Sequence, residues 1–571
     1  MEATLLQRME NTTSCQNSTP ILDQPTATSP RSKTNGLNMW PNGDIIMSWN
    51  IMKHAVARCG QHRHWELYKH ELTPGGDITA LTPGPSPSIK AEFVSSDIAM
   101  DISYPEPIIS NDVAASPSTP GSPDITASLI RNYVVNIHSK SPILDLEFLK
   151  KLEEQLLENN QLPLWPVHKE LPAGLQPSDM AILLLVLALG EVSTKTNPEN
   201  EPLKQSYYIT LALPWLGVTA FGNAPPMNDL QAQLLLASYY MWILKPWRAW
   251  SYAETAAAKA ETVLLRYPGI LEQKLSHRVL WAVAKMQLEL TEEIYPHLGL
   301  VKLGRLGQLI QSTPIPPPPP QPFEWPSIGP QLDTDTWYYY LAETSSRRLV
   351  ERIKAELYNI RMSSLPADLR ASSQPFETSP ATAYNLEQSI KQRMRKVLVD
   401  RQGQLLMLVF RPFLAALAES DESVTTSESL LKGAARYVHY AMKFLIQQNE
   451  QPVRHYGCWL LARNIWSTAL SLIAACHIPA VVVRIDTGEM ASPNTDSVML
   501  DSPMSHGSFG ASVSGGPFRQ KALEACQDAH QLLRLWDGES PSLSFCSDQL
   551  WALIVDAQWH VSGGQINTLP Q

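Results

Sequence analysis

Four side chains near the N-terminus carry atoms that bind zinc, and they fall within 12 residues of one another: Cys59, His62, His64 and His70, with His54 nearby. Thiolates and imidazoles are the usual zinc ligands, so the set could in principle hold an ion. The spacing nevertheless matches no established zinc finger, and no second cysteine lies near. We therefore predict a solvated histidine-rich patch, with no metal site and no cofactor.

Motifs for nucleophilic and phosphate chemistry are missing from the sequence. Gly507-Ser508-Phe509-Gly510 is not a Gly-x-Ser-x-Gly elbow, and no strand pattern precedes it. Gly515-Gly516 is followed by Pro517 and Phe518, whereas a phosphate-binding loop requires Gly-Lys-Ser/Thr. No dinucleotide fingerprint follows a strand. We expect no catalytic residue and a protein that is not an enzyme.

Several polar and aromatic residues stand out inside the apolar segments. His138 is expected to be a core or capping histidine with satisfied hydrogen bonds, and Arg411 is expected to cap or pair within the helical body. A tryptophan cluster surrounds Pro246 and Arg248. We expect it to pack between helices, and the alternative is an aromatic wall beside an effector pocket; its members are Trp242, Trp247 and Trp250.

The elements that must position these residues are helices. A helix N-cap is predicted at Asn228 and Asp229, and apolar residues follow it at i, i+4, i+7 and i+11. These residues are Leu230, Leu234, Ala237 and Met241. A second segment repeats the spacing with Val279, Val283, Met286 and Leu290. The sequence contains few runs in which apolar and polar residues alternate, so strands should be rare. The predicted fold class is all-α.

A further helix is predicted over residues 337–358. Its apolar residues Leu349, Ile353 and Leu357 should be buried together. Glu343 precedes Arg347 by four residues, a spacing that predicts an exposed ion pair.

Composition divides the chain into two parts. Residues 1–124 are rich in Ser, Thr and Pro and are predicted to be disordered, with a short helix within 49–72 that could dock on the body. Residues 125–571 form the predicted helical domain. It is interrupted by a proline-rich linker at 312–331 and by disordered loops at 364–383 and 485–517.

Charge and cysteine usage limit the partners. The net charge is −10, and residues 1–125 hold 8 Lys/Arg against 13 Asp/Glu, so tight DNA binding is not expected. The six cysteines are scattered singly, as in an intracellular protein with reduced thiols, and no signal peptide is read. The apolar run 180–189 is too short to span a membrane, and 459–483 contains charged and polar residues, so both are predicted to be core helices.

Seven blocks occur in a fixed order along the chain: Tyr133–Phe148, Met180–Gly190, Tyr207-Tyr208, Gln233–Tyr240 with Pro246–Trp250, His277–Leu290, Trp337–Leu349 and Leu405–Leu414. This ordered set resembles the fungal-specific transcription factor domain, the helical body of six-cysteine zinc cluster regulators. The sequence departs from that family in two ways. It has Lys285-Met286-Gln287 where an acidic residue is usual after the tryptophan of the His277 block, and it contains neither the cysteine cluster nor a basic run.

The resemblance implies a nuclear, pathway-specific transcriptional regulator of the kind found beside secondary-metabolite gene clusters. Without a zinc cluster, the protein would bind DNA only weakly, or indirectly through a DNA-binding or transcriptional protein partner. The other explanation for the missing cluster is a 5′ exon that the gene model has lost. A homodimer and a small-molecule effector are both compatible with the resemblance. The alternatives are a scaffold that retains the fold and a metabolite sensor without direct transcriptional action.

Overall fold

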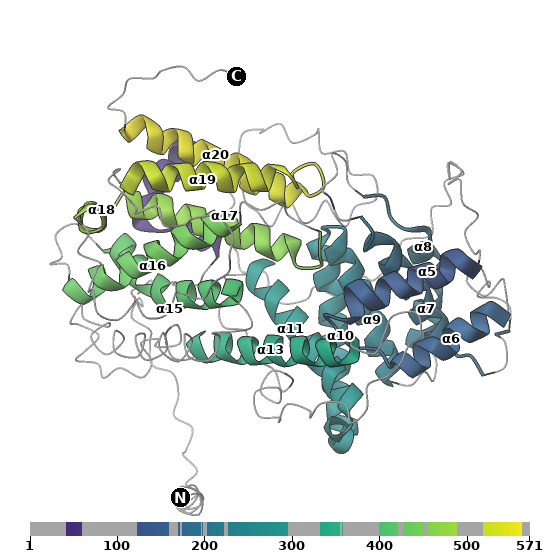
Figure 1. Ribbon diagram of the computed structural model, residues 1–571. Coiled ribbons are helices and arrows are strands. Elements are labelled where there is room, and N and C mark those ends of the chain that lie inside the picture. The colour runs from purple at the N-terminus through teal and green to yellow at the C-terminus, as the bar shows by residue number, and fades with distance from the viewer. Residues whose placement is uncertain are drawn as a thin grey trace, which may run out of the picture. The chain divides into compact units, whose positions relative to one another are not determined.

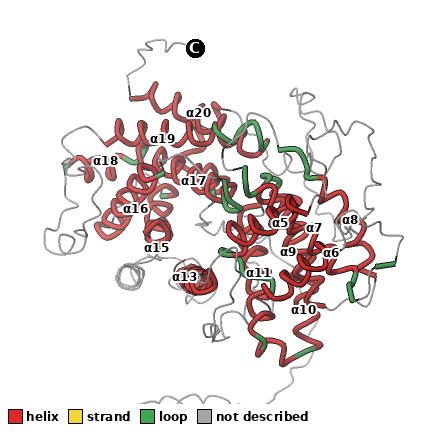
Figure 2. Tube along the Cα trace, turned by 45° about the vertical axis from the view of Figure 1, so that its right-hand side comes forward, coloured by secondary structure: helices red, strands yellow, loops and turns green. Residues whose placement is uncertain are grey.

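The computed structural model describes residues 42–59, 123–158, 170–171, 174–195, 197, 203–221, 226–294, 306, 332–354, 357, 399–420, 427–448, 454–487 and 518–561. All of them belong to one compact unit, Asn38–Gln571, while a second unit, Met1–Leu37, lies outside the described residues. Every regular element within these ranges is a helix, and none is a strand (Figure 2). The predicted all-α class is confirmed.

The helices keep the labels of Figure 1 and follow one another along the chain in this order: α2 (Gly43–Met47), η2 (Asn50–Met52), α3 (Lys53–Cys59), α5 (Pro123–Tyr133), the π-helix η4 (Val134–His138), α6 (Leu146–Glu158), α7 (Pro177–Val192), α8 (Tyr207–Phe221), α9 (Pro226–Trp242), α10 (Pro246–Arg266), η6 (Pro268–Glu272), α11 (Lys274–Ile294), α13 (Leu332–Ile353), α15 (Val399–Glu419), α16 (Glu428–Gln447), α17 (Cys458–Cys476), α18 (Pro479–Asp486), α19 (Phe518–Arg534) and α20 (Pro541–Val561).

Helix α7 forms the centre of the first group of helices. Its residues 180–189 have no exposed surface, since α5, α8 and α9 all pack against it. A helix that is apolar on every side is stable only when it is enclosed in this way. Its start is well defined: Pro177 occupies the first turn, and the Asp179 carboxylate accepts the backbone N–H of Gln176 at 2.9 Å, as in a capping box.

Helices α9, α10 and α11 continue this group. Adjacent members pack on each other, and the apolar stripes predicted from the sequence face the core. The predicted N-cap of α9 is wrong, because the helix already begins at Pro226. Asn228 and Asp229 therefore lie in its first turn, where Asn228 donates to Asp179 and Asp229 pairs with Lys259 at 2.6 Å.

The second group is built around α17. Helices α16, α19 and α20 pack against it, and α15 packs against α16 (Figure 1). Among the described helices, α17 is long and apolar enough to cross a membrane, with a mean hydropathy of 1.2. Its most apolar window is 83% buried inside the protein, and Arg463 within it is fully enclosed and paired with carboxylates.

The N-terminal helices α2 and α3 lie against this second group. Helix α2 packs on α17, η2 packs on α15 and α3 packs on α20, and the side chains of Ile46, Trp49 and Met52 are completely buried. The helical stretch therefore begins at Gly43, upstream of the 49–72 window predicted to contain a short helix, and residues 60–72 lie outside the described part. Residues 42–59 belong to the packed body, because this stretch has an apolar face that α17 and α20 cover.

The predicted interruptions are only partly described. The linker at 312–331 and the loop at 364–383 lie outside the described residues, as does most of 485–517. The start of that last loop was predicted too early, since α18 continues to Asp486. Leu349, Ile353 and Leu357 are buried as predicted.

Candidate functional site

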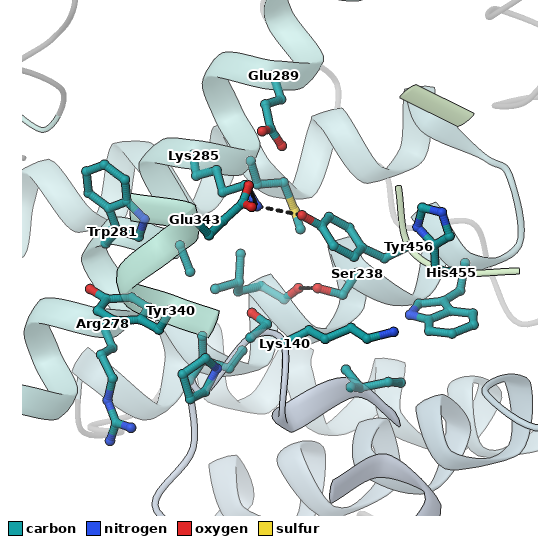
Figure 3. Close-up of a pocket in the computed structure, with 18 of the residues that line it drawn as sticks. Lys140, Ser238, Arg278, Trp281, Lys285, Glu289, Tyr340, Glu343, His455 and Tyr456 are labelled. Carbon is teal, nitrogen blue, oxygen red and sulfur yellow. Dashed lines mark hydrogen bonds and ion pairs between the residues drawn. The ribbon is translucent and has the colours of Figure 1, made fainter. Parts of the chain in front are cut away.

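A cavity opens where the two groups of helices meet. Its lining comes from α9, α11 and α13, from the end of η4 with the turn that follows, and from His455 and Tyr456 before α17 (Figure 3). Its volume is about 60 Å³, several times the roughly 10–15 Å³ that one water molecule needs.

The walls of the cavity are largely apolar and aromatic. Helix α9 contributes Leu234, Ser238 and Trp242, each about one turn after the last on its buried face, and α11 contributes Trp281 and Met286. The helical period explains this placement, because residues at i, i+4 and i+8 share one face. Apolar walls with a few placed polar groups are the usual composition of a small-molecule site.

A hydrogen-bonded network joins three elements on one side of the cavity. The Lys285 ammonium on α11 pairs with the Glu343 carboxylate on α13 at 2.8 Å and donates to the Tyr456 hydroxyl at 2.6 Å (Figure 3). It also lies 5.2 Å from the centroid of the Tyr456 ring. Burial raises the pKa of Tyr456 to about 12, and the neighbouring Lys285 charge opposes that rise. Tyr456 is therefore a neutral phenol at physiological pH.

Charged residues between α11 and α13 contradict one sequence prediction. Glu343 and Arg347 were expected to form an exposed pair, but Glu343 is buried and pairs with Lys285. Arg347 instead pairs with Glu351 at 3.1 Å and with Glu292 at 3.4 Å. The i, i+4 spacing therefore pairs Arg347 with Glu351 on the same helix, while Glu343 pairs with Lys285 on the neighbouring helix α11.

Tyr340 lies at the other end of the lining, near Arg278 (Figure 3). Its hydroxyl is 3.2 Å from Nδ1 of His277, and burial raises its pKa to about 12. Burial, together with the positive charge of Arg348, lowers the pKa of His277. Both partners are therefore neutral at pH 7, and they form a fixed polar contact behind the cavity.

Lys140 and Trp242, both in the lining, have side-chain donors without partners among the described residues. Lys140, in the exposed turn after η4, makes no side-chain hydrogen bond or ion pair within the described part of the chain. The Trp242 side chain is 3% exposed, and its Nε1 has no acceptor among the described residues. Donors of this kind are normally satisfied by protein, water or a ligand.

The structure separates the tryptophan cluster predicted from the sequence. Trp242 lines the cavity, but Trp247 and Trp250 do not. Those two rings lie 5.3 Å apart, and Trp250 Nε1 donates to the Thr291 hydroxyl at 3.1 Å. The prediction of packing between helices therefore holds for Trp247 and Trp250, whereas Trp242 forms part of an aromatic cavity wall.

His138 and Arg411 are both buried, and neither lines the cavity. Arg411 pairs within the body as predicted: its guanidinium donates to the Tyr437 hydroxyl at 3.1 Å and lies 5.5 Å from the centroid of that ring. The expectation of satisfied hydrogen bonds fails for His138, because its Nδ1 has no partner among the described residues. Burial, and secondarily the charge of Arg278, lowers the pKa of His138 to about 3.

The metal candidates are only partly visible. His54 and Cys59 lie on α3, whereas His62, His64 and His70 fall outside the described residues. No group of three or more potential ligands occurs among the residues that the structure describes. Burial raises the pKa of Cys59, which disfavours the thiolate that a metal would need. All five described cysteines are free thiols, and four of them are buried.

Sequence reasoning missed the polar residues of the cavity, Lys140, Glu343 and Tyr456, because they come from segments far apart in the chain. One signal was present: Lys285 replaces the acidic residue usual in the resembled family, and it is the residue that joins Glu343 to Tyr456.

The arrangement is suited to binding. Lys285 is held by the Glu343 carboxylate, and the Ser238 hydroxyl donates to the Leu234 carbonyl at 2.8 Å. No protein-family model, curated protein or solved structure matches this chain.

Proposed function

We propose that this protein is a nuclear transcriptional regulator of the fungal-specific transcription factor domain type, and that it acts through its helical body. It controls one pathway, of the kind encoded by a secondary-metabolite gene cluster. DNA recognition is supplied by a DNA-binding or transcriptional protein partner, because the sequence contains no six-cysteine cluster.

The observation that carries the proposal is the position of the seven blocks that resemble the family. In chain order they fall on the end of α5 with η4, then on α7, α8, α9 with α10, α11, α13 and α15. These helices supply much of the buried core. A resemblance spread over successive core helices concerns the whole body, whereas one short shared motif would concern a single segment.

Charge supports an indirect route to DNA. With a net charge of −10, long-range electrostatics oppose approach to a phosphate backbone. We expect the purified chain alone to bind duplex DNA only non-specifically, with a Kd of roughly 10⁻⁴ M or weaker at physiological salt. A gel shift showing sequence-specific, sub-micromolar binding by the chain alone would contradict the partner-dependent mechanism.

The decisive experiment compares transcripts. Deleting the gene should change the transcripts of a defined gene set, and re-expressing a fluorescently tagged wild-type chain should restore them and place the signal in the nucleus. A chain carrying Arg411→Ala should fail to restore them, because it loses the buried contact to Tyr437. Lys204→Met, at an exposed position outside the cavity, serves as the matched control. Unchanged transcripts in every condition of expression would refute the proposal.

The cavity favours a second candidate, a small-molecule sensor without direct transcriptional action. A sensor would bind its ligand with the same residues, but its deletion would leave transcripts unchanged. The same deletion strain therefore separates the two functions.

A further inference from the structure

We infer that the cavity binds a small carboxylate attached to an apolar or aromatic body. The inference deepens the proposed function, because such a compound would be the regulator's effector. Its test uses purified protein, so that its outcome does not depend on whether the protein controls transcription.

Lys140 and Trp242 both line the cavity, and neither the Lys140 ammonium nor the Trp242 indole N–H has a partner among the described residues. Ammonium and indole N–H groups can only donate hydrogen bonds. A complementary ligand must therefore offer acceptors, and the positive charge of Lys140 favours a negatively charged one.

The acidic residues of the lining do not reverse this preference. Glu343 is neutralised by Lys285 at 2.8 Å, and Glu289 lies 3.8 Å from a guanidinium nitrogen of Arg347. Lys140, by contrast, has no carboxylate partner in the described part of the chain. The lining also contains the cation Arg278 on α11, so the charge that the cavity presents to a ligand is positive, with Lys140 as its exposed member.

Positions along the cavity suggest how the ligand is oriented. Lys140 is exposed, whereas Trp242 and Trp281 are buried. Figure 3 shows Lys140 extended below Ser238, while Lys285, Glu343 and Tyr456 meet above it. A carboxylate near Lys140 would stay close to water, and the apolar body would contact the walls formed by Leu234, Trp281 and Met286. This placement avoids moving an ionised group into an apolar interior.

The choice of a carboxylate over a neutral compound rests on the charge of Lys140, and the Trp242 indole N–H offers a second donor. A buried donor that is unsatisfied without ligand gains a full hydrogen bond when an acceptor arrives, and a charged acceptor forms the stronger bond. A purely apolar ligand would leave both donors unpaired and would benefit only from the walls.

The test measures binding of three acids, benzoate, 2-naphthoate and octanoate, each against its primary amide. Isothermal titration calorimetry and saturation-transfer NMR on the full chain give the affinities. At least one acid should bind saturably with 1:1 stoichiometry and at least tenfold more tightly than its amide, which corresponds to about 1.4 kcal/mol.

Variants assign the binding to this cavity. Lys140→Met keeps the apolar stem and should weaken acid binding at least tenfold without changing amide binding, and Lys140→Arg should restore most of the affinity. Trp242→Phe keeps a ring but removes the donor, and should weaken acid binding about three- to tenfold. Lys204→Met should bind like the wild type, because Lys204 is exposed and does not line the cavity. Near-UV circular dichroism checks that each variant is folded.

Three results would overturn the inference: no saturable binding of any acid up to 10 mM, equal affinity for acids and amides, or acid binding unaffected by Lys140→Met in folded protein. Acid binding that depends on Lys140 in a protein whose deletion leaves transcripts unchanged would support this inference and refute the proposed function. Changed transcripts in the deletion strain together with no Lys140-dependent acid binding would support the proposed function and refute this inference.

Discussion

Arg454 and Glu539 form an ion pair whose two side chains have no exposed surface. The guanidinium donates to both carboxylate oxygens, at 2.5 and 2.7 Å, and lies 4.9 Å from the centroid of the Trp536 ring. It also donates to the Trp242 carbonyl at 3.2 Å, so that one side chain connects the end of α9, the start of α17 and the turn between α19 and α20. His455 and Tyr456 of the cavity follow Arg454 directly, and the pair therefore holds that wall of the cavity in place.

Breaking this pair should destabilise the protein strongly. Arg454→Met leaves the Glu539 carboxylate buried without its partner, and we expect a loss of about 3–5 kcal/mol in the free energy of unfolding. Denaturant titration followed by fluorescence measures it. Lys432→Ala is the matched control, because Lys432 and Glu428 form a pair with side chains 54% and 64% exposed, and its removal should change stability by less than about 0.5 kcal/mol. Equal effects of the two substitutions would argue against a structural role for Arg454.

The contact between α5 and α7 requires a glycine at position 190. A Cβ there would lie 2.0 Å from the Leu129 carbonyl oxygen, a backbone atom that cannot rotate away. Gly190→Ala should therefore push the helices apart and destabilise the protein by roughly 1–3 kcal/mol. Gly403→Ala on α15 has open space around the added carbon and should be neutral or stabilising by up to about 1 kcal/mol. Thermal unfolding of the two variants compares them, and a stable Gly190→Ala protein would show that the helices are less closely packed.

The N-terminal helices should stay bound to the body after the chain is cut. Arg463 donates to Asp44 at 3.1 Å and to Glu293 at 3.2 Å, and Trp49 is fully buried. If a protease site is inserted between residues 60 and 122, the N-terminal fragment should co-elute with the body in gel filtration after cleavage.

Two substitutions test which contacts retain that fragment. Gly43→Val should release it, because a Cβ at position 43 would lie 2.0 Å from the Trp466 ring. Arg58→Ala should retain it, since it removes one pair of which the Arg58 side chain is 48% exposed and leaves the buried contacts of Trp49 in place. Release of the unmodified fragment would mean that the covalent connection alone holds the helices in place.

His138 should make stability depend on pH. Burial lowers its pKa from 6.5 to about 3, so the folded protein keeps it neutral while the unfolded chain binds a proton below pH 6.5. Stability from this residue is present above pH 6.5 and is lost as the pH falls toward 3, by about 1.4 kcal/mol per pH unit. Between pH 7.5 and pH 5, the free energy of unfolding of the His138→Phe protein should therefore fall by about 2 kcal/mol less than that of the wild type. Parallel stability curves for the two proteins would contradict the burial of a neutral histidine.

The sequence by itself determined the helical class and the faces of several helices. Leu230, Leu234, Ala237 and Met241 share a face because of the 3.6-residue period, and the unbroken apolar run of α7 required enclosure on all sides. These properties are local, since they depend only on spacing and on the free energy of removing apolar surface from water. Arg411 could likewise be expected to have a partner, because a buried guanidinium requires one, but spacing could not identify Tyr437.

Only the tertiary structure decided which distant residues meet. The pairing of Lys285 with Glu343 and Tyr456, the assignment of Trp242 to the cavity and of Trp250 to helix packing, and the complete burial of Trp49 all depend on how helices are oriented across the core. The predicted Glu343–Arg347 pair was wrong for the same reason. A charged side chain pairs with the nearest opposite charge in space, and helix packing, which sequence spacing does not encode, determines which charge that is.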